Sequence, residues 1–242
     1  MFSLNNLMIT HHIYKSDDIN TIPASTQVLY INISNISSVS SVGNTINSNI
    51  LLPPLQCLYC SGNKLTTFLL QLPTSLRILH CNSNKLTSLP RLSHLSSLQI
   101  LYCSFNKLKS LPQLPKSLSE LYCNHNRLVI LPQLPTSLDE LYCHNNKLTS
   151  LPQLPISLLI LDCHNNRLTS LPPIPTSLQE LIYHGNNMPQ YNGMNLEQII
   201  QYQAQIIEAN TIKICNIVLV LAATLPHNMI KRVCRAMAIM QI

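Results

Sequence analysis

The chain has 242 residues, of which 46% are apolar, so it can build a hydrophobic core and is not a wholly disordered protein. Four glycines beside 16 prolines, with no glycine-rich phosphate loop, argue against a nucleotide-binding α/β enzyme. The formal net charge of +6 is mild for this length, so charge alone does not indicate nucleic acid as the partner.

Residues 1–54 form a separate N-terminal segment in this interpretation. The first residues lack the basic head, apolar run and cleavage site of a signal peptide, so we expect an intracellular, cytoplasmic protein. The run Val28-Leu29-Tyr30-Ile31, with Ile33, Ile36 and Val39 after it, could form a degenerate first repeat. The polar stretch from Ser40 to Asn49 is typical of a loop.

A tandem pattern, L-x-x-L-x-C-x-x-N-x-L-x-x-L-P-x-L-P-x-S, fills residues 55–190. Its asparagine recurs at intervals of 21, 22, 20, 20, 20 and 20 residues. The seven asparagines are Asn63, Asn84, Asn106, Asn126, Asn146, Asn166 and Asn186. A fixed period of this length predicts a solenoid of stacked coils that share one core.

These seven units resemble the leucine-rich repeat family, in its short, proline-rich subtype. That subtype is best known from secreted bacterial effectors that act inside host cells, and similar arrays occur in giant viruses that infect amoebae. The resemblance implies an α/β repeat fold with a parallel β-sheet on a concave face that binds partners. It also allows a location within a host cell.

The pattern itself explains such a coil. In each unit the fourth and sixth positions, such as Leu121 and Cys123, alternate with an outward residue, here Tyr122, as in a short strand. The asparagine can turn inward and bond backbone groups that the bend leaves unpaired. The Leu-Pro return, for example residues 131–135, cannot be helical, so we expect an extended, polyproline-like convex side.

The cysteines are best explained as small buried side chains. Nine is an odd number, and six of them occupy the inward strand position once per unit, which does not suit a disulfide framework. The one C-x-x-C pair, Cys57 and Cys60, differs in strand facing and is a weak metal motif.

Residues 191–242 are expected to form a helical C-terminal cap over the last coil. Asn195 is a suitable N-cap for a helix in which Leu196, Ile199, Ile200, Ile206 and Ile207 share a face. Two further apolar stretches, residues 212–225 and 229–242, flank Pro226, and the first is too short to span a bilayer. We therefore expect no transmembrane segment.

The outward strand positions supply the candidate binding residues. The fifth position of the unit is rich in tyrosine, which offers contact area at low entropic cost, and the third position becomes acidic in the C-terminal half. The candidate residues for binding a partner are Tyr59, Tyr102, Tyr122, Tyr142, Glu120, Glu140, Asp162, Glu180, His144 and His164. Recent duplication of the units is the alternative explanation for such rows.

The seventh position places His144, His164 and His184 on adjacent strands, with Asp162 the nearest outward residue on the middle one. Such a group could share a metal ion or a proton. Stacked side chains, however, point in parallel rather than converging, and we expect neither a metal nor another cofactor.

A basic row follows the asparagines and defines one edge of the array. It consists of Lys64, Lys85, Lys107, Arg127, Lys147 and Arg167. The row could meet an acidic protein, a phosphate backbone or an anionic membrane, although a solvated turn position is the simpler explanation. Lys231, Arg232 and Arg235 lie in a candidate amphipathic helix that could lie on a membrane, but capping is favoured.

The sequence therefore predicts a non-enzymatic scaffold that binds an unidentified protein on its concave face. No nucleophile motif or metalloprotease motif is present, and the tail is too short for the ubiquitin-ligase domain of some effectors. One alternative is a host-directed adaptor that presents a bound protein to a pathway such as ubiquitination. Another is binding of nucleic acid or membrane through the basic edge.

Overall fold

The structure is a computed structural model, and it describes residues 10–13, 22–31, 52–67 and 72–224. The chain divides into two compact units, Met1–Gln190 and Tyr191–Ile242. Several expectations fall outside the described residues. These are the N-terminal Ile33, Ile36, Val39 and the loop 40–49, and the C-terminal stretch 229–242 with Lys231, Arg232 and Arg235.

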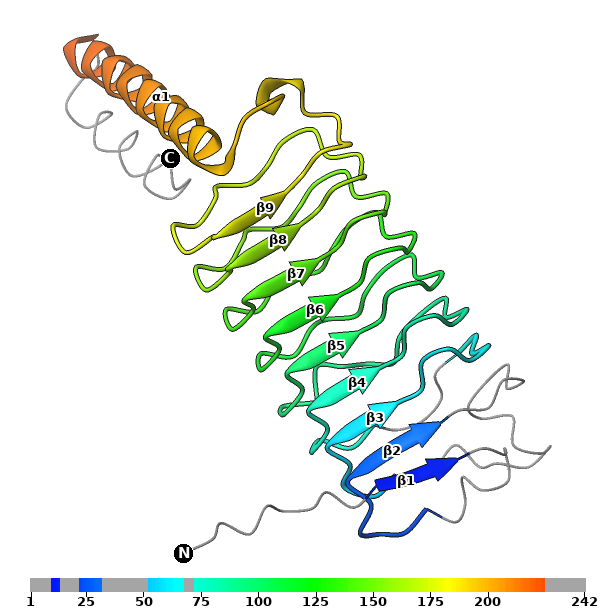
Figure 1. Cartoon of the computed structure of the whole chain (residues 1–242). Helices are drawn as coiled ribbons and strands as arrows, with labels where there is room; N and C mark the ends of the chain where they lie inside the picture. Colours follow the sequence, from blue (N-terminus) through cyan, green and yellow to red (C-terminus); the bar gives the residue numbers. More distant parts are fainter. Residues whose placement is uncertain (1–9, 14–21, 32–51, 68–71, 225–242) are drawn as a thin grey trace, which may run out of the picture. The chain divides into compact units, whose positions relative to one another are not determined.

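The first unit contains one parallel sheet whose strands follow the chain order from β1 to β9 (Figure 1). The first two strands have four residues, and the others have three, which are the third to fifth positions of each repeat. The strands are β1 Thr10–Ile13, β2 Val28–Ile31, β3 Cys57–Tyr59, β4 Ile78–His80, β5 Ile100–Tyr102, β6 Glu120–Tyr122, β7 Glu140–Tyr142, β8 Ile160–Asp162 and β9 Glu180–Ile182.

Neighbouring strands pair without any shift in the repeat. Leu101 lies beside Leu121, and Leu121 beside Leu141, so every position of the unit forms a row across the sheet. Val28–Ile31, expected as a degenerate coil, pairs in parallel with β3 and places Tyr30 beside Tyr59. The parallel sheet predicted from the tandem pattern is confirmed.

The core consists of the inward leucines and cysteines. In the unit that contains β6, Leu118, Leu121, Cys123 and Leu128 are fully buried, while Leu131 on the return is 7% exposed. A fully buried leucine contributes roughly 1.5–3 kcal/mol, and each coil has one apolar surface on either side that only a neighbour can cover. The coils are therefore stable only as a stack.

The asparagine of each unit points into the turn after the strand. The Asn126 amide nitrogen donates to the carbonyls of Cys103 (3.0 Å) and Cys123 (3.1 Å), and its Oδ1 accepts from the Leu108 N–H (3.0 Å). The bond to the previous coil recurs at the asparagine of every unit from Asn84 to Asn186, so each of these coils is linked to the one before it. The structural role predicted for the asparagines is confirmed.

The return segments between strands are irregular and extended, without a helix in the described repeats 72–186. Serine joins five of them to the previous coil, through Ser75, Ser117, Ser137, Ser157 and Ser177, a role that the sequence pattern did not reveal. Ser137 Oγ donates to the Leu118 carbonyl at 2.7 Å, and Ser157 Oγ donates to the Leu138 carbonyl at 2.6 Å. The expectation of an extended rather than helical return is confirmed.

The residue before each asparagine has a left-handed backbone. Phe105 and His125 have φ values of 54° and 52°, and Gly62 and Gly185 have 70° and 68° at the equivalent place. Side chains with a Cβ are strained in this region, whereas glycine is not. Glycine at both ends of the array could have indicated this turn, which was not predicted from the sequence.

The second unit contains the helix α1, Leu196–Thr224, which follows the short 3₁₀ turn η2, Pro189–Tyr191. Asn195 caps it as predicted, since its Oδ1 accepts from the Gln198 N–H and the Gln198 side chain accepts from the Asn195 N–H, both at 2.9 Å. The helix continues through residues 212–224, which were expected to be a separate stretch. Ile199 is buried, but Ile207 is 58% exposed, so the expected apolar face is not buried along its length.

No helix within the described residues combines the length and apolar character that a membrane crossing requires.

Candidate functional site

The fifth position of the repeat forms a continuous stack of aromatic rings on the outer face of the sheet. Each ring contacts the ring on the next strand, with centroids between 4.1 and 4.7 Å apart and nearly parallel planes. We call this stack the ring ladder. Its members are His12, Tyr30, Tyr59, His80, Tyr102, Tyr122 and Tyr142.

The ladder follows from the sheet itself. Parallel strands lie roughly 4.8 Å apart, which is close to the distance at which aromatic rings stack, so identical rotamers on successive strands bring the rings into contact. Inside the ladder each ring has both faces covered and shows its edge to solvent. Candidate residues Tyr59, Tyr102, Tyr122 and Tyr142 all belong to it, although Tyr59 and Tyr102 are separated by His80.

Carboxylates line the ladder at its C-terminal half. The Tyr122 hydroxyl donates to Glu140 at 2.8 Å and lies 3.2 Å from Glu120. Burial, the hydrogen bond to Glu140 and the two negative charges raise the pKa of Tyr122 far above its usual value. Burial and the neighbouring Glu140 charge also raise the pKa of Glu120. The candidate residues Glu120, Glu140 and Tyr122 therefore form one hydrogen-bonded group.

The ladder ends at Tyr142. One face of its ring stacks on Tyr122, at 4.7 Å, whereas the residue beside it on β8 is Asp162 rather than an aromatic side chain. Ile182 follows at the same position on β9. Candidate residue Glu180 is exposed on β9, in the row of Glu140, with Ile160 between them.

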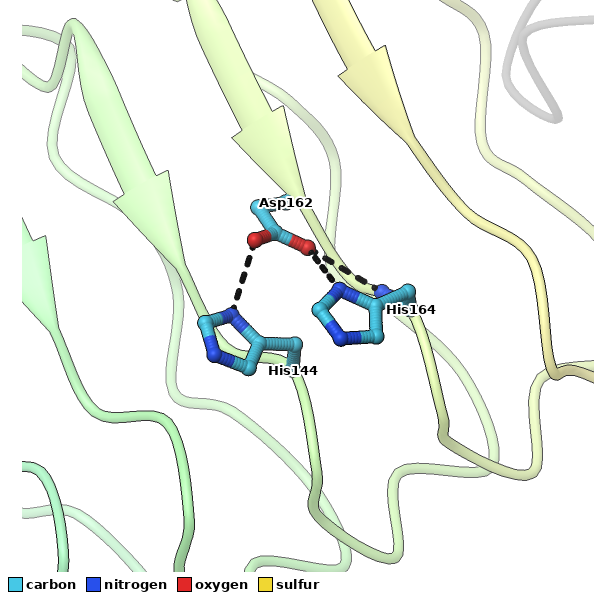
Figure 2. Close-up of side chains that lie close together, drawn as sticks. All are labelled: His144, Asp162 and His164. Carbon is cyan, nitrogen blue, oxygen red and sulfur yellow. Dashed lines mark hydrogen bonds and ion pairs between the residues drawn. The ribbon is translucent and has the colours of Figure 1, made fainter.

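Asp162 is in contact with two histidines, His144 and His164 (Figure 2). Its two carboxylate oxygens lie 2.6 Å from Nδ1 of His164 and 2.9 Å from Nδ1 of His144, so each ring points one nitrogen at the same acid. The rings themselves stack at 4.4 Å, and His184 stacks on His164 at 4.7 Å. The rings are parallel, as expected, but two of them converge on the carboxylate.

Within this group the His164–Asp162 contact is a hydrogen bond, and the His144–Asp162 contact is an ion pair when His144 is protonated. His144, Asp162 and His164 are the residue types of a metal site, and their ligand atoms lie within 4.8 Å of one another. Two ligands bound to one tetrahedral zinc at roughly 2.0–2.1 Å would be about 3.3 Å apart, which is more than the 2.6 and 2.9 Å seen here. Burial lowers the pKa of His144, an effect that the Asp162 charge opposes. The absence of a metal stays a prediction.

Two residues differ from their expected exposure. Asp162 was expected on the open surface but is only 5% exposed, because the histidine rings beside it cover its carboxylate. Cys57, in the row of outward third positions, is 6% exposed and buried like Cys60. The inward cysteines are fully buried as predicted, and burial raises the pKa of Cys123 to about 12.

The basic row is exposed at all six positions. Its backbone supports the turns, since the Lys107 N–H donates to the Leu86 carbonyl and the Arg127 N–H donates to the Leu108 carbonyl, at 2.8 and 2.9 Å. A second short stack lies between this row and the sheet, where Phe105 and His125 have ring centroids 4.2 Å apart. Sequence reasoning did not single out these two residues, although they share the eighth position of the unit.

The chain is similar to known leucine-rich repeat proteins in sequence and structure. Residues 74–116 match the family model described as leucine rich repeats (2 copies). YopM from Yersinia enterocolitica WA-314 is 32% identical with a TM-score of 0.53, over 68% of this chain and 39% of that one. A leucine-rich effector protein YopM from Yersinia pestis is 31% identical with a TM-score of 0.53, over 66% and 51%. A Shigella effector leucine-rich repeat domain is 29% identical with a TM-score of 0.56, over 69% and 72%.

The matched region spans from two fifths to about half the length of the two YopM chains. No curated protein sequence gives a significant match.

Proposed function

We propose that this chain, which is a leucine-rich repeat protein of the bacterial-effector-like type, is a non-enzymatic scaffold that binds another protein on the outer face of its sheet. The ring ladder is the observation that carries the proposal. It offers a row of half-buried tyrosines whose rotamers are already fixed by their neighbours. A partner that docks on them therefore loses little side-chain entropy.

The chemistry of the face supports protein binding over catalysis. The aromatic edges, tyrosine hydroxyls and carboxylates provide both apolar contact and hydrogen bonds, which is the usual composition of an interface core. Burial raises the pKa of the inward cysteines and of Tyr122, which keeps these groups uncharged. Groups in these forms do not act as nucleophiles.

We also propose a reducing, intracellular site of action. The eight cysteines in the described residues are free thiols, and seven of them are buried. Buried thiols beside one another on successive coils persist where the surroundings keep cysteine reduced.

The test compares two double variants in partner capture from a cell extract. Tyr102→Ala with Tyr122→Ala should abolish capture, while Val129→Ala with Ile130→Ala, which removes two exposed side chains from the return segment, should leave it unchanged. Both variants should keep the circular dichroism spectrum of the parent protein. Equal capture by the two variants would contradict binding on the sheet.

The salt dependence of capture separates this surface from the basic row. Binding through Lys107 and Arg127 would weaken steeply with added salt and with charge reversal at both residues. Binding on the tyrosines should change little in the Lys107→Glu, Arg127→Glu variant. A steep salt dependence together with sensitivity to this variant would favour the basic edge instead.

A further inference from the structure

The C-terminal half of the sheet face concentrates the negative charge of the protein. Five of the nine Asp and Glu residues of the chain lie on β6 to β9 or immediately before β7. They are Glu120, Asp139, Glu140, Asp162 and Glu180. No Lys or Arg lies on these four strands, although the chain carries a net charge of +6.

Two of these carboxylates, Glu140 and Glu180, lie in the row next to that of Tyr142 and have no cationic partner among the described residues. Asp162 is already in contact with His144 and His164, whereas Glu140 uses one oxygen to accept the hydrogen bond of the Tyr122 hydroxyl and keeps its charge. Glu180 is exposed, and the ion pairs of the described residues involve neither Glu180 nor Glu140. These two glutamates flank Ile160 in one row and are two strand spacings apart, roughly 10 Å at the backbone.

The Tyr142 ring lies in the next row over the same strands, and among the described residues no aromatic ring stacks on its β8 side, which we call its free face. Its ring is the last of the ladder, and on the β8 side it meets a short carboxylate that is turned toward the histidines. In the described residues its hydroxyl has no hydrogen-bond partner within the chain. Every other tyrosine of the ladder has a ring against each of its faces.

We propose that an arginine side chain of the partner continues the ring ladder at this point, with its guanidinium stacked on the free face of Tyr142 and paired with Glu140 and Glu180. This inference rests on the proposed function and names the chemistry of the partner, a basic segment that contains arginine. A guanidinium is planar and stacks on aromatic faces, so it suits a place where the ladder lacks its next ring. The carboxylates on β7 and β9 lie on either side of it and match its forked donors.

Lysine fits this place less well than arginine. Its ammonium is compact and strongly hydrated, and it cannot present a flat face to the ring or bond two separated carboxylates through a rigid fork. Neutral planar groups fit the stack but leave the carboxylates unpaired. A site of this kind should therefore bind arginine more tightly than lysine and more tightly than a neutral planar side chain.

The experiment uses the full chain and three fluorescein-labelled peptides with the sequence Gly-X-Ser repeated three times, where X is arginine, lysine or citrulline. Fluorescence anisotropy at low salt should show that the arginine peptide binds at least threefold tighter than the lysine peptide, and that the citrulline peptide binds weakest. Equal affinities for arginine and lysine would overturn the stacking on Tyr142, since a diffuse negative surface makes no such distinction.

Matched variants locate the site. Glu140→Gln with Glu180→Gln should weaken the arginine peptide about tenfold or more, whereas Glu197→Gln with Glu208→Gln, which removes two charges from α1, should change it less than twofold. Tyr142→Leu should weaken it about threefold to tenfold, and Tyr59→Leu, at the other half of the ladder, should not. Equal losses in the paired variants would overturn the proposal.

The two proposals can fail separately. If the Tyr102, Tyr122 double variant loses its partner but the arginine peptide does not bind selectively, the sheet face binds proteins and only the arginine inference is wrong. If the arginine peptide binds as expected but capture is insensitive to the two tyrosines, the scaffold function assigned to the ladder is wrong.

Discussion

Replacement of Asn126 by alanine tests the internal asparagine row. The Asn126 side chain is 9% exposed and joins two coils through the carbonyls of Cys103 and Cys123 and the N–H of Leu108. The two carbonyls keep a second donor in the variant, since Asn106 also donates to Cys103 and Asn146 to Cys123. The Leu108 N–H loses its hydrogen-bond partner altogether.

The expected loss of stability follows from the one hydrogen bond that is lost without replacement and the two that are weakened. A buried N–H without a partner costs roughly 1–3 kcal/mol, and each weakened carbonyl adds roughly 0.5–1 kcal/mol. We expect Asn126→Ala to lower the free energy of unfolding by about 2–5 kcal/mol. Asn126→Asp should cost at least as much, although it is nearly the same size, because its oxygens would replace an amide donor beside two carbonyls.

Urea denaturation followed by circular dichroism measures the loss. The matched control is Asn187→Ala, since that side chain is exposed and its backbone N–H, which donates to the Leu168 carbonyl at 2.8 Å, is unaffected. An exposed substitution of this kind should change stability by less than about 0.5 kcal/mol. If Asn126→Ala costs no more than Asn187→Ala, the asparagine row does not hold the coils together and the reasoning fails.

Three further outcomes are expected. Gly62→Ala should cost about 1 kcal/mol of unfolding free energy in urea, because its φ of 70° strains a side chain, while no atom beyond the two adjoining residues lies within 4 Å of the added carbon. An effect of several kcal/mol would contradict this. A Cys215→Ser, Cys234→Ser variant keeps seven of the nine thiols, and in Ellman's assay at pH 8 these should react slowly in the folded protein and completely in denaturant. The reason is that, among the described cysteines, only Cys215 is exposed. Rapid reaction of the folded variant would refute the buried cysteine row. Burial lowers the pKa of His80 in the folded protein. As the pH falls, His80 is therefore protonated in the unfolded chain before it is protonated in the folded one, and stability decreases below the pKa of an unfolded histidine, about 6.5. His80→Tyr keeps a ring between Tyr59 and Tyr102 and should reduce the fall in melting temperature between pH 7.5 and 5, and an unchanged fall would show that His80 does not contribute.

Most of the solenoid could be predicted because one unit repeats seven times. The spacing within a unit indicates the physical roles of Leu121, Cys123 and Asn126, and the same spacing is repeated in the other units. The helix α1 was harder, since Lys213 and Asn216 interrupt the apolar pattern but do not end a helix. A proline, or a glycine at the C-terminal cap, is the usual signal for that.

The sequence predicted which candidate residues share a row of the sheet, but not which residues of different rows contact one another. Spacing placed the tyrosines on one face, and it did not show that Asp162 would be covered by His144 and His164. That contact depends on the rotamers of three side chains from two coils, which no single-unit pattern contains. The free face of Tyr142 arises in the same way, from the one unit in which the tyrosine is replaced by aspartate.

The unshifted pairing of the strands makes the array adjustable in length. Residues 127–146 contain one complete period of 20, and they begin and end at the same place in the coil. A precise deletion of that segment, or its duplication, would return Asn126 or its copy to a neighbour with the same carbonyls and the same inward leucines. A gene that encodes such a chain can therefore lengthen or shorten the sheet by recombination between copies, and each new coil brings its own share of the core.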